Sequence, residues 1–259
     1  MPLDALLQYL LPYLPALARV GGIVGCAPLL GSAVVPRRVR ALIAVALTMG
    51  LLPSLAPTPT QQTPLGGFAL SIVSEALIGI AIGGAMNLIF VAAQWSGELI
   101  AQQMGLSLAE SFDPTMQSHG TVLGGGFSLL TMVVFLGING HHALIRGIQS
   151  SFQSLPVSTA VNGASIIDMF ARLLTAACAF AIQLAAPVCI TLLICDLALG
   201  MVGRTVPQVG LMTAGITVRA VVGLLVLVLC AALTTALLQS ASINWMQVVT
   251  SAIPSLSGQ

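Results

Sequence analysis

Six long apolar stretches dominate this chain of 259 residues and limit the folds that it can adopt. A helix needs about 20 apolar residues to cross the hydrocarbon core of a bilayer, which is about 30 Å thick. The stretches come close to that length, and we place them at residues 5–31, 41–56, 65–93, 121–138, 170–200 and 211–238. The sequence therefore predicts an all-α integral membrane protein with about six hydrophobic helices, and we treat residues 1–259 as a single domain.

Charged residues are scarce and exclude several classes of protein. They make up 6% of the chain, whereas soluble domains carry about 25%, so a water-soluble fold is excluded. With 57% hydrophobic residues the chain is also not intrinsically disordered. The formal net charge is +1, and nucleic-acid binding requires many basic contacts to phosphate, so we expect no nucleic acid as a partner.

Prolines and charges interrupt the apolar stretches. Arg19 lies in the first stretch and Glu75 in the third, the fifth contains Pro187 and Asp196, and Arg219 lies in the last. A charge at the centre of a bilayer costs a few kcal/mol on insertion scales. We therefore expect neighbouring protein to shield these helices, which would pack as tilted, broken hairpins inside an assembly.

Glu75, Gly79 and Gly83 follow one another at four-residue spacing, so they share one face of a helix. The two glycines would let a second helix approach closely. An intramembrane carboxylate is also a candidate proton or ion site. We favour a packing face with an ion pair at an interface, and we interpret Gly21-x-x-x-Gly25 as a packing face too.

The other charges suggest further pairs. Asp196 and Arg204 would lie on one face if their helix is continuous, and Asp168 and Arg172 have the spacing of a helical i,i+4 pair. Arg219 is compatible with a functional role or with a salt bridge to a neighbouring subunit. The interface or buried charges that the sequence predicts are Glu75, Asp196, Arg204 and Arg219.

The sequence gives little support to catalysis. His141 and His142 are adjacent, so we expect them to point in different directions on a helix, and no H-E-x-x-H motif is present. Ser165 ends a partial match to an intramembrane serine protease motif, but Ile166 stands where glycine is required, and we place Ser165 in a connection. Four of the five cysteines lie in strongly apolar runs, which indicates buried thiols rather than disulfides. We expect no catalytic residue, no metal and no cofactor.

The segment from Gly97 to Gly120 is predicted to be a long connection that ends near the helix-stopping pair Asp113-Pro114. Long irregular connections are uncommon in compact proteins and often functional. Its methionine and large apolar residues could form a deformable seal, or they could simply pack the loop. These residues are Met104, Leu106, Leu108 and Phe112.

Seven groups of residues occur in an order that identifies a family. They are Arg19 with Ala27-Pro28 and the run from Val35 to Arg40; Glu75 with Ile78-Gly79; Gly97 to Ile100 with Gln103 to Ser107 and Asp113-Pro114; Phe135-Leu136 with Asn139 to His141; Ser151-Phe152 with Leu155-Pro156; Ala186 to Val188; and Leu197 to Gly200 with Arg204 and Pro207-Gln208. Through them the chain resembles the FliR family, the R subunits of the bacterial flagellar export gate, whose injectisome counterparts are the T subunits of type III secretion. It departs from the family pattern at Val209-Gly210.

The resemblance implies a component of the flagellar type III protein export gate, in the bacterial inner membrane within the flagellar basal body. There the R subunit would join several P and Q subunits in a closed helical assembly that passes unfolded flagellar proteins, next to the B and A export components. It also implies a P-like part at about residues 1–165, with a plug loop at 101–120, and a Q-like part at 166–259. Met104, Leu106, Leu108 and Phe112 would then be plug or gate residues.

Two other classes of protein stay open as alternatives. A secondary transporter of a small solute would use Glu75, Asp196 and Arg219 as ion-coupling residues, but such transporters usually contain inverted repeats, and we find none. An intramembrane hydrolase would need a Ser/His pair within the spans. Ser165 and the three histidines fall mostly in connections.

Overall fold

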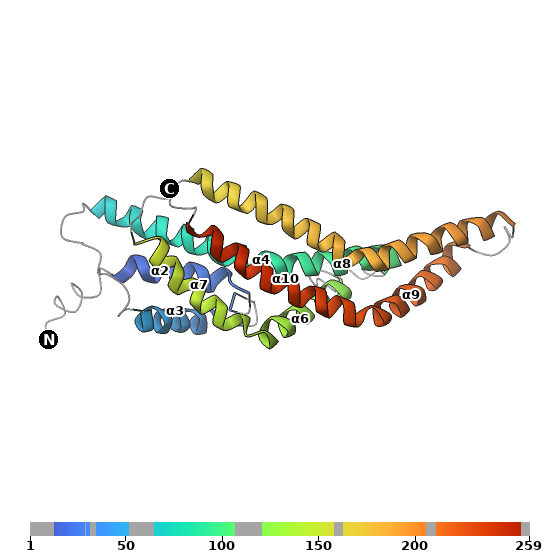
Figure 1. Ribbon diagram of the computed structural model, residues 1–259, viewed down its shortest axis with the longest axis horizontal. Coiled ribbons are helices and arrows are strands. Elements are labelled where there is room, and N and C mark those ends of the chain that lie inside the picture. Colours follow the sequence, from blue (N-terminus) through green and yellow to red (C-terminus); the bar gives the residue numbers. More distant parts are fainter. Residues whose placement is uncertain are drawn as a thin grey trace. The chain divides into compact units, whose positions relative to one another are not determined.

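The computed structural model describes residues 13–28, 30–31, 35–51, 65–106, 121–157, 163–205 and 211–254, and all regular structure in these ranges is helical (Figure 1). Two helices, α4 and α8, are long and apolar enough to cross a membrane. The pairs α6 with α7 and α9 with α10 would each make one more span if they count as broken spans. The prediction of an all-α membrane protein is confirmed.

The helices fall into two compact units that interleave along the sequence. They are α2 (Leu14–Cys26), α3 (Arg37–Leu51), α4 (Leu65–Met104), α6 (Val122–Gly137), α7 (Gly140–Ser154), α8 (Gly163–Thr205), α9 (Leu211–Leu229) and α10 (Ala231–Ala252). The first unit comprises Met1–Leu88, Asn139–Leu174 and Ile243–Gln259, and the second comprises Ile89–Ile138 and Thr175–Ser242. The predicted division into a P-like and a Q-like part refers to resemblance to other subunits. The two compact units do not test it, so it stays a prediction.

In the first unit, α2 packs tightly against α4. A Cβ atom on Gly22 would lie 2.7 Å from the Ala76 carbonyl oxygen, and one on Gly83 would lie 2.7 Å from the Ile23 carbonyl oxygen. Gly21 and Gly25, which the sequence suggested as a packing face, have open space and do not contribute to this contact; their packing against other protein stays a prediction. The Arg19 side chain faces α4, and residues three or four positions further along α2, such as Gly22 and Ile23, lie on the same face. Gly21 and Gly25 do not have this spacing from Arg19.

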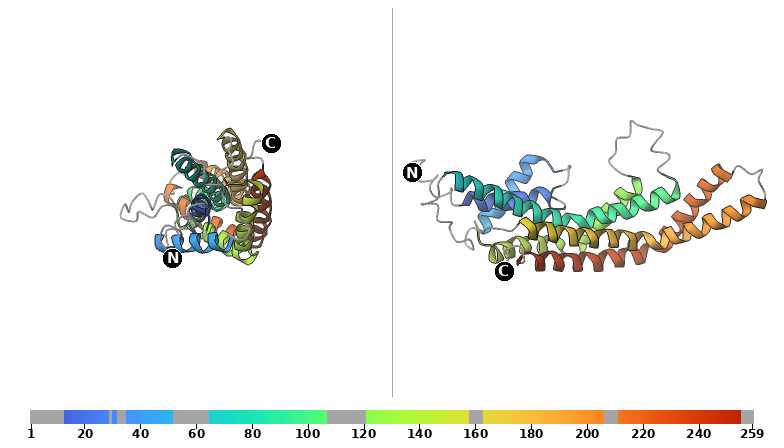
Figure 2. Two further views of the ribbon diagram at one scale, coloured as in Figure 1. Left: turned by 90° about the vertical axis from the view of Figure 1, so that its left-hand side faces the viewer. Right: turned by 90° about the horizontal axis from the view of Figure 1, so that it is seen from above.

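The second unit has one apolar core, to which α4, α6, α8 and α10 contribute buried residues. Its buried members are Ala93, Ile100, Met104, Phe127, Leu184, Ala185, Val188, Leu192 and Leu238. Pro187 lies inside α8 without ending it, and the Thr191 hydroxyl bonds to the carbonyl oxygens of Pro187 at 3.0 Å and Val188 at 2.8 Å. The last part of α8 and α9 run side by side as a hairpin (Figures 1 and 2).

α4 continues well beyond the predicted end at residue 93. The polar residues there stay on the helix because the Gln94 amide donates to the Glu98 carboxylate at 2.9 Å, one turn further on. In the same stretch Ile100 and Ala101 are buried. The helix ends at Gly105, whose φ of 78° is the left-handed conformation that glycine adopts most easily.

Three other boundaries also differ from the predictions. α7 occupies a stretch that we predicted to be a connection, and it buries Leu144, Ile148 and Phe152 at four-residue spacing. Ser165 lies in the first turns of α8 and not in a connection. α10 extends the last apolar stretch to Ala252, and the indole nitrogen of Trp245 donates to the Ala85 carbonyl oxygen at 2.9 Å.

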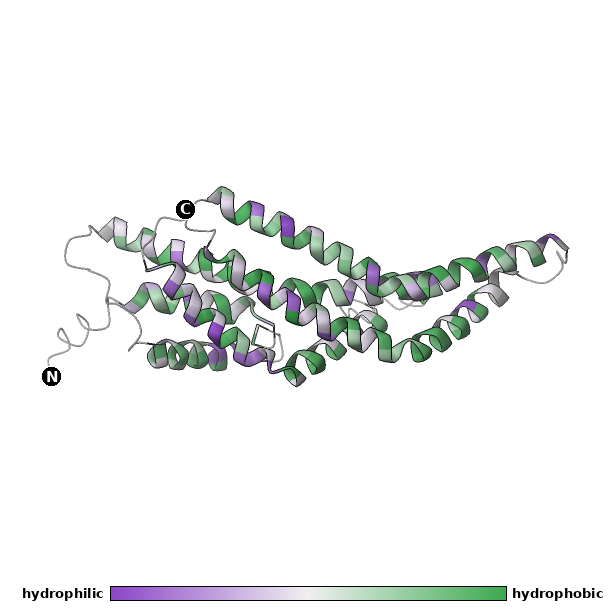
Figure 3. Ribbon diagram, viewed as in Figure 1, coloured by the Kyte–Doolittle hydropathy of each residue, from purple (hydrophilic) through white to green (hydrophobic). Residues whose placement is uncertain are grey.

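Apolar residues cover most of the surface of several helices and not a single stripe (Figure 3). The most apolar window of α4 is 61% buried, whereas that of α8 is only 28% buried. The exposed side chains of α8 include Ile190, Leu193, Ile194 and Leu197. Such a surface requires lipid or other protein to cover it.

Candidate functional site

A fully buried ion pair joins α2 to α4 in the first unit. The Arg19 Nε atom donates to the Glu75 Oε2 atom at 2.5 Å, and both side chains are 0% exposed. Glu75 was predicted to be a buried charge, and the structure supplies its partner from the same chain. We expected neighbouring protein to shield Glu75, but here the chain itself shields both charges.

The same guanidinium also holds the end of α7. Its Nη1 atom donates to the carbonyl oxygens of Ser151 at 3.1 Å and Leu155 at 2.7 Å. The Arg19 Cζ atom lies 4.5 Å from the centroid of the Phe152 ring. A cation is favourable at the C-terminus of a helix, where carbonyl groups lack helical partners. One side chain thus connects α2, α4 and α7.

A second ion pair joins α8 to α9 in the second unit. The Arg219 Nε atom donates to the Asp196 Oδ1 atom at 2.5 Å, and these side chains are 37% and 25% exposed. We expected Arg219 to face a neighbouring subunit if structural, and Asp196 to share a face with Arg204. α8 is continuous from Gly163 to Thr205, which is the condition under which Asp196 and Arg204 were predicted to share a face. The ion-pair partner of Asp196 is nevertheless Arg219, because α9 folds back along α8, while Arg204 is exposed near the end of α8.

The structure describes two of the four predicted plug residues, Met104 and Leu106. Met104 is 2% exposed and belongs to the core of the second unit, where a Cβ atom on Gly223 of α9 would lie 2.7 Å from its Cγ atom. Leu106 follows the end of α4 and is 38% exposed. Leu108 and Phe112 lie outside the described residues. A gate role for these four residues stays a prediction.

The helices on either side of the predicted plug loop contact each other closely. A Cβ atom on Gly97 of α4 would lie 2.6 Å from the Leu123 carbonyl oxygen. The Thr121 hydroxyl oxygen accepts from the Gly124 amide at 3.0 Å and caps α6. The end of α4 and the start of α6 therefore form a fixed base within the second unit.

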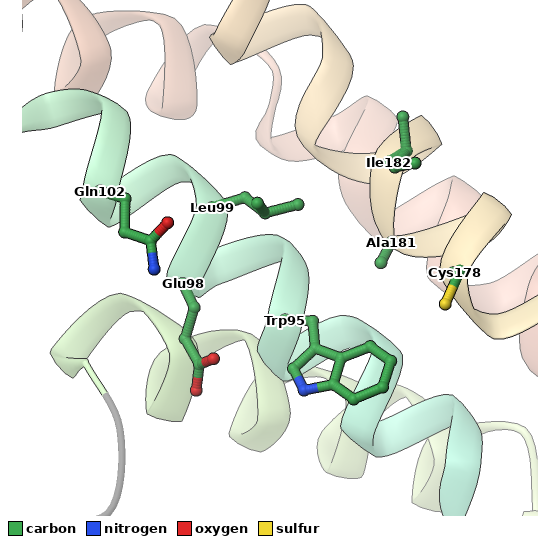
Figure 4. Close-up of a pocket in the computed structure, with 7 residues that line it drawn as sticks. All are labelled: Trp95, Glu98, Leu99, Gln102, Cys178, Ala181 and Ile182. Atoms are coloured by element: carbon green, nitrogen blue, oxygen red, sulfur yellow. The ribbon is translucent and has the colours of Figure 1, made fainter. Parts of the chain in front are cut away.

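A pocket of about 340 Å³ lies between α4 and α8 in the second unit (Figure 4). Its lining residues are Trp95, Glu98, Leu99 and Gln102 of α4, and Cys178, Ala181 and Ile182 of α8. This site could not be predicted from the sequence, because its walls come from segments about 80 residues apart that only the fold brings together.

The remaining candidate groups are the histidines, the cysteines and one surface ion pair. The His141 and His142 rings lie with centroids 4.3 Å apart, closer than we expected for adjacent positions on a helix. No group of three His, Cys, Asp or Glu residues in the described ranges could hold a metal ion. All five cysteines are free thiols, but the prediction that they are buried is wrong, because four are half-buried and Cys178 is exposed. Asp168 and Arg172 form the predicted i,i+4 pair at 3.0 Å on the surface.

Comparison with known proteins identifies relatives over most of the chain. A sequence model of the family described as "Bacterial export proteins, family 1" matches residues 10–244. The chain is 33% identical to "Flagellar biosynthetic protein FliR" of Escherichia coli (strain K12) over 220 residues, which cover 84% of this chain and 83% of the relative. It is 31% identical to the protein of the same name from Caulobacter vibrioides, over 82% of this chain and 85% of the relative. For the Aquifex aeolicus protein of that name the identity is 28%, over 88% of each chain.

Proposed function

This chain belongs to the bacterial export proteins, family 1, and from that membership we propose that it is a component of the flagellar type III protein export gate. The single observation that carries the proposal is the match to relatives named flagellar biosynthetic protein FliR over more than four-fifths of this chain. The two long apolar helices support a position in a membrane. Family membership does not favour the alternative of a secondary transporter.

The finer proposal is a hetero-oligomer in the bacterial inner membrane, within the flagellar basal body. The chain would join P and Q subunits, contact the B and A components, and help to pass unfolded flagellar proteins. The uncovered apolar surface of α8 supports an assembly, because such a surface requires lipid or other protein to cover it. No catalytic role is proposed for any residue.

Gating is the mechanism that we propose for the segment after α4. A narrow ring of apolar side chains excludes water and ions from a pore, and a passing chain can displace it. The exposed Leu106 side chain, at the fixed base formed by α4 and α6, supports this role for the start of the segment. Met104 would anchor the segment to the core, and Leu108 and Phe112 would complete the seal.

Assembly is tested by co-expression with the candidate P and Q genes, purification through a tag on this chain in mild detergent, and native mass spectrometry. We expect one large complex that contains a single copy of this chain and several copies of two small membrane proteins. A stable monomer or homodimer without partners would contradict the proposal and favour the transporter.

The gate is tested by conductance of the assembled complex in planar bilayers. We expect Leu106→Ala and Phe112→Ala to leak ions while the complex keeps its composition, because each removes apolar volume from the seal. Leu129→Ala is the matched control, since Leu129 is 70% exposed on α6, outside the predicted plug. Conductance equal to that of the control would show that the substituted residue does not belong to the gate.

A further inference from the structure

The pocket between α4 and α8 has apolar walls and a polar edge. Figure 4 shows the Leu99 side chain reaching toward α8, while the carboxylate of Glu98 and the amide of Gln102 lie along the α4 side. A space of about 340 Å³ would hold several water molecules, so it is also large enough for one long side chain. The pocket is built entirely from residues of the second unit.

Glu98 is the acidic residue in the described part of the chain that lacks a cation. The other three described acidic residues, Glu75, Asp168 and Asp196, each form an ion pair with an arginine. Glu98 accepts a hydrogen bond from the neutral Gln94 amide. Glu98 is half-buried beside apolar walls, and a carboxylate in such surroundings is stabilised when a positive group meets it.

Glu98 also packs against the start of a neighbouring helix, α6. A Cβ atom on Gly124 would lie 2.9 Å from the Glu98 Cγ atom, so the side chain packs on the first turn of α6. The N-terminus of a helix carries partial positive charge and favours a nearby anion. Glu98 is thus held as a fixed negative group at the edge of an open apolar pocket.

We propose that this pocket receives a Lys or Arg side chain from an apolar helix of another subunit of the export gate. The proposal rests on the proposed function, because it requires such a subunit. The long aliphatic stem of Lys or Arg would pack against Trp95 and Ile182, and its charged head would donate to Glu98. A lipid acyl chain would match the apolar walls but would leave the carboxylate without a donor.

A native thiol in the pocket allows a direct test. Cys178 lines the pocket and is exposed, so its modification by N-ethylmaleimide reports whether the pocket is filled. We would replace Cys26, Cys189, Cys195 and Cys230 by alanine and compare the chain alone with the complex. We expect Cys178 to react about tenfold more slowly in the complex. A chain that retains only Cys230, which does not line the pocket, is the matched control for general shielding.

Substitution of Glu98 tests the charge. Glu98→Gln keeps the acceptor for Gln94 but removes the charge, so Cys178 in that complex should react about tenfold faster than in the unsubstituted one. Glu98→Asp keeps the charge and should retain the protection. If Glu98→Gln folds but no longer assembles while Glu98→Asp does, the result supports the proposal equally.

Other outcomes overturn the proposal and are distinct from one another. A complex that forms but leaves Cys178 as reactive as in the chain alone would remove the pocket from the interface without affecting the proposed function. Unchanged protection of Cys178 in the Glu98→Gln complex would show that no cation from a partner pairs with Glu98. Protection of the chain alone by phosphatidylethanolamine vesicles would make lipid the occupant. Failure to form any complex would overturn both this proposal and the proposed function.

Discussion

Replacing Arg19 by alanine is expected to destabilise the first unit by about 3–5 kcal/mol, a large fraction of the 5–15 kcal/mol that holds a typical protein folded. The substitution leaves the fully buried Glu75 carboxylate without its cation. It also removes the donor to the Ser151 and Leu155 carbonyl oxygens at the end of α7. The measurement is thermal unfolding of the detergent-purified chain, together with the amount of chain recovered from membranes.

Two controls distinguish the effect of losing the buried ion pair from the effect of losing an arginine in general. Arg172→Ala removes an ion pair whose side chains are 79% and 62% exposed, and it should cost less than about 0.5 kcal/mol. The double substitution Arg19→Met with Glu75→Leu should recover part of the loss, because it removes both buried charges. It cannot restore the bonds to α7. If Arg19→Ala were as stable as Arg172→Ala, the buried pair would not stabilise the fold.

Gly79→Ala is the second substitution with a large expected effect. The new methyl group would occupy the space of the Arg19 carbonyl oxygen on α2, which is backbone and cannot turn aside. The two helices would have to separate, so we expect a loss of about 1–3 kcal/mol or more. Separation would also stretch the bond between Arg19 and Glu75, because both lie at the same helix contact.

Gly21→Ala is the matched control with the opposite expected sign. Gly21 lies inside α2, and a Cβ atom there would meet nothing within 4 Å. Alanine favours a helix over glycine by up to about 1 kcal/mol, so this variant should be as stable as the unsubstituted chain or more stable. Unfolding temperatures of the two variants, measured side by side in one detergent, should move in opposite directions. Equal changes would show that α2 does not pack on α4 through Gly79.

Much of the fold was predictable because composition alone requires it. A chain with 6% charged residues and long apolar stretches has few choices besides membrane helices. Family membership was predictable because several short motifs occur in one order, and the match over residues 10–244 confirms it. The end of α4 was not predictable, because Gln94 and Glu98 are as polar as loop residues. Their mutual hydrogen bond becomes available only once the helix exists.

Charge partners on different helices could not be predicted from spacing, although the i,i+4 pair of Asp168 and Arg172 was predicted in that way. The sequence indicates which residues share a helix face, and it placed Arg204 on the face of Asp196 without naming an ion-pair partner for Asp196. The structure pairs it with Arg219, on a different helix and 23 positions away. The same reasoning missed the bonds from Arg19 to α7, which cross 132 and 136 positions. Each of these contacts depends on how helices fold back on one another.

The length of α8 has a consequence for how this protein is made. Its 43 residues, at about 1.5 Å each, give a helix of about 65 Å along its axis. The hydrocarbon core, about 30 Å thick, contains only about 26 of these residues even at a tilt of about 40°. The rest of the helix lies beyond the hydrocarbon core. In the proposed export gate, neighbouring subunits would cover this remainder, and by mass action the apparent stability of a newly made copy would rise with the concentration of those subunits.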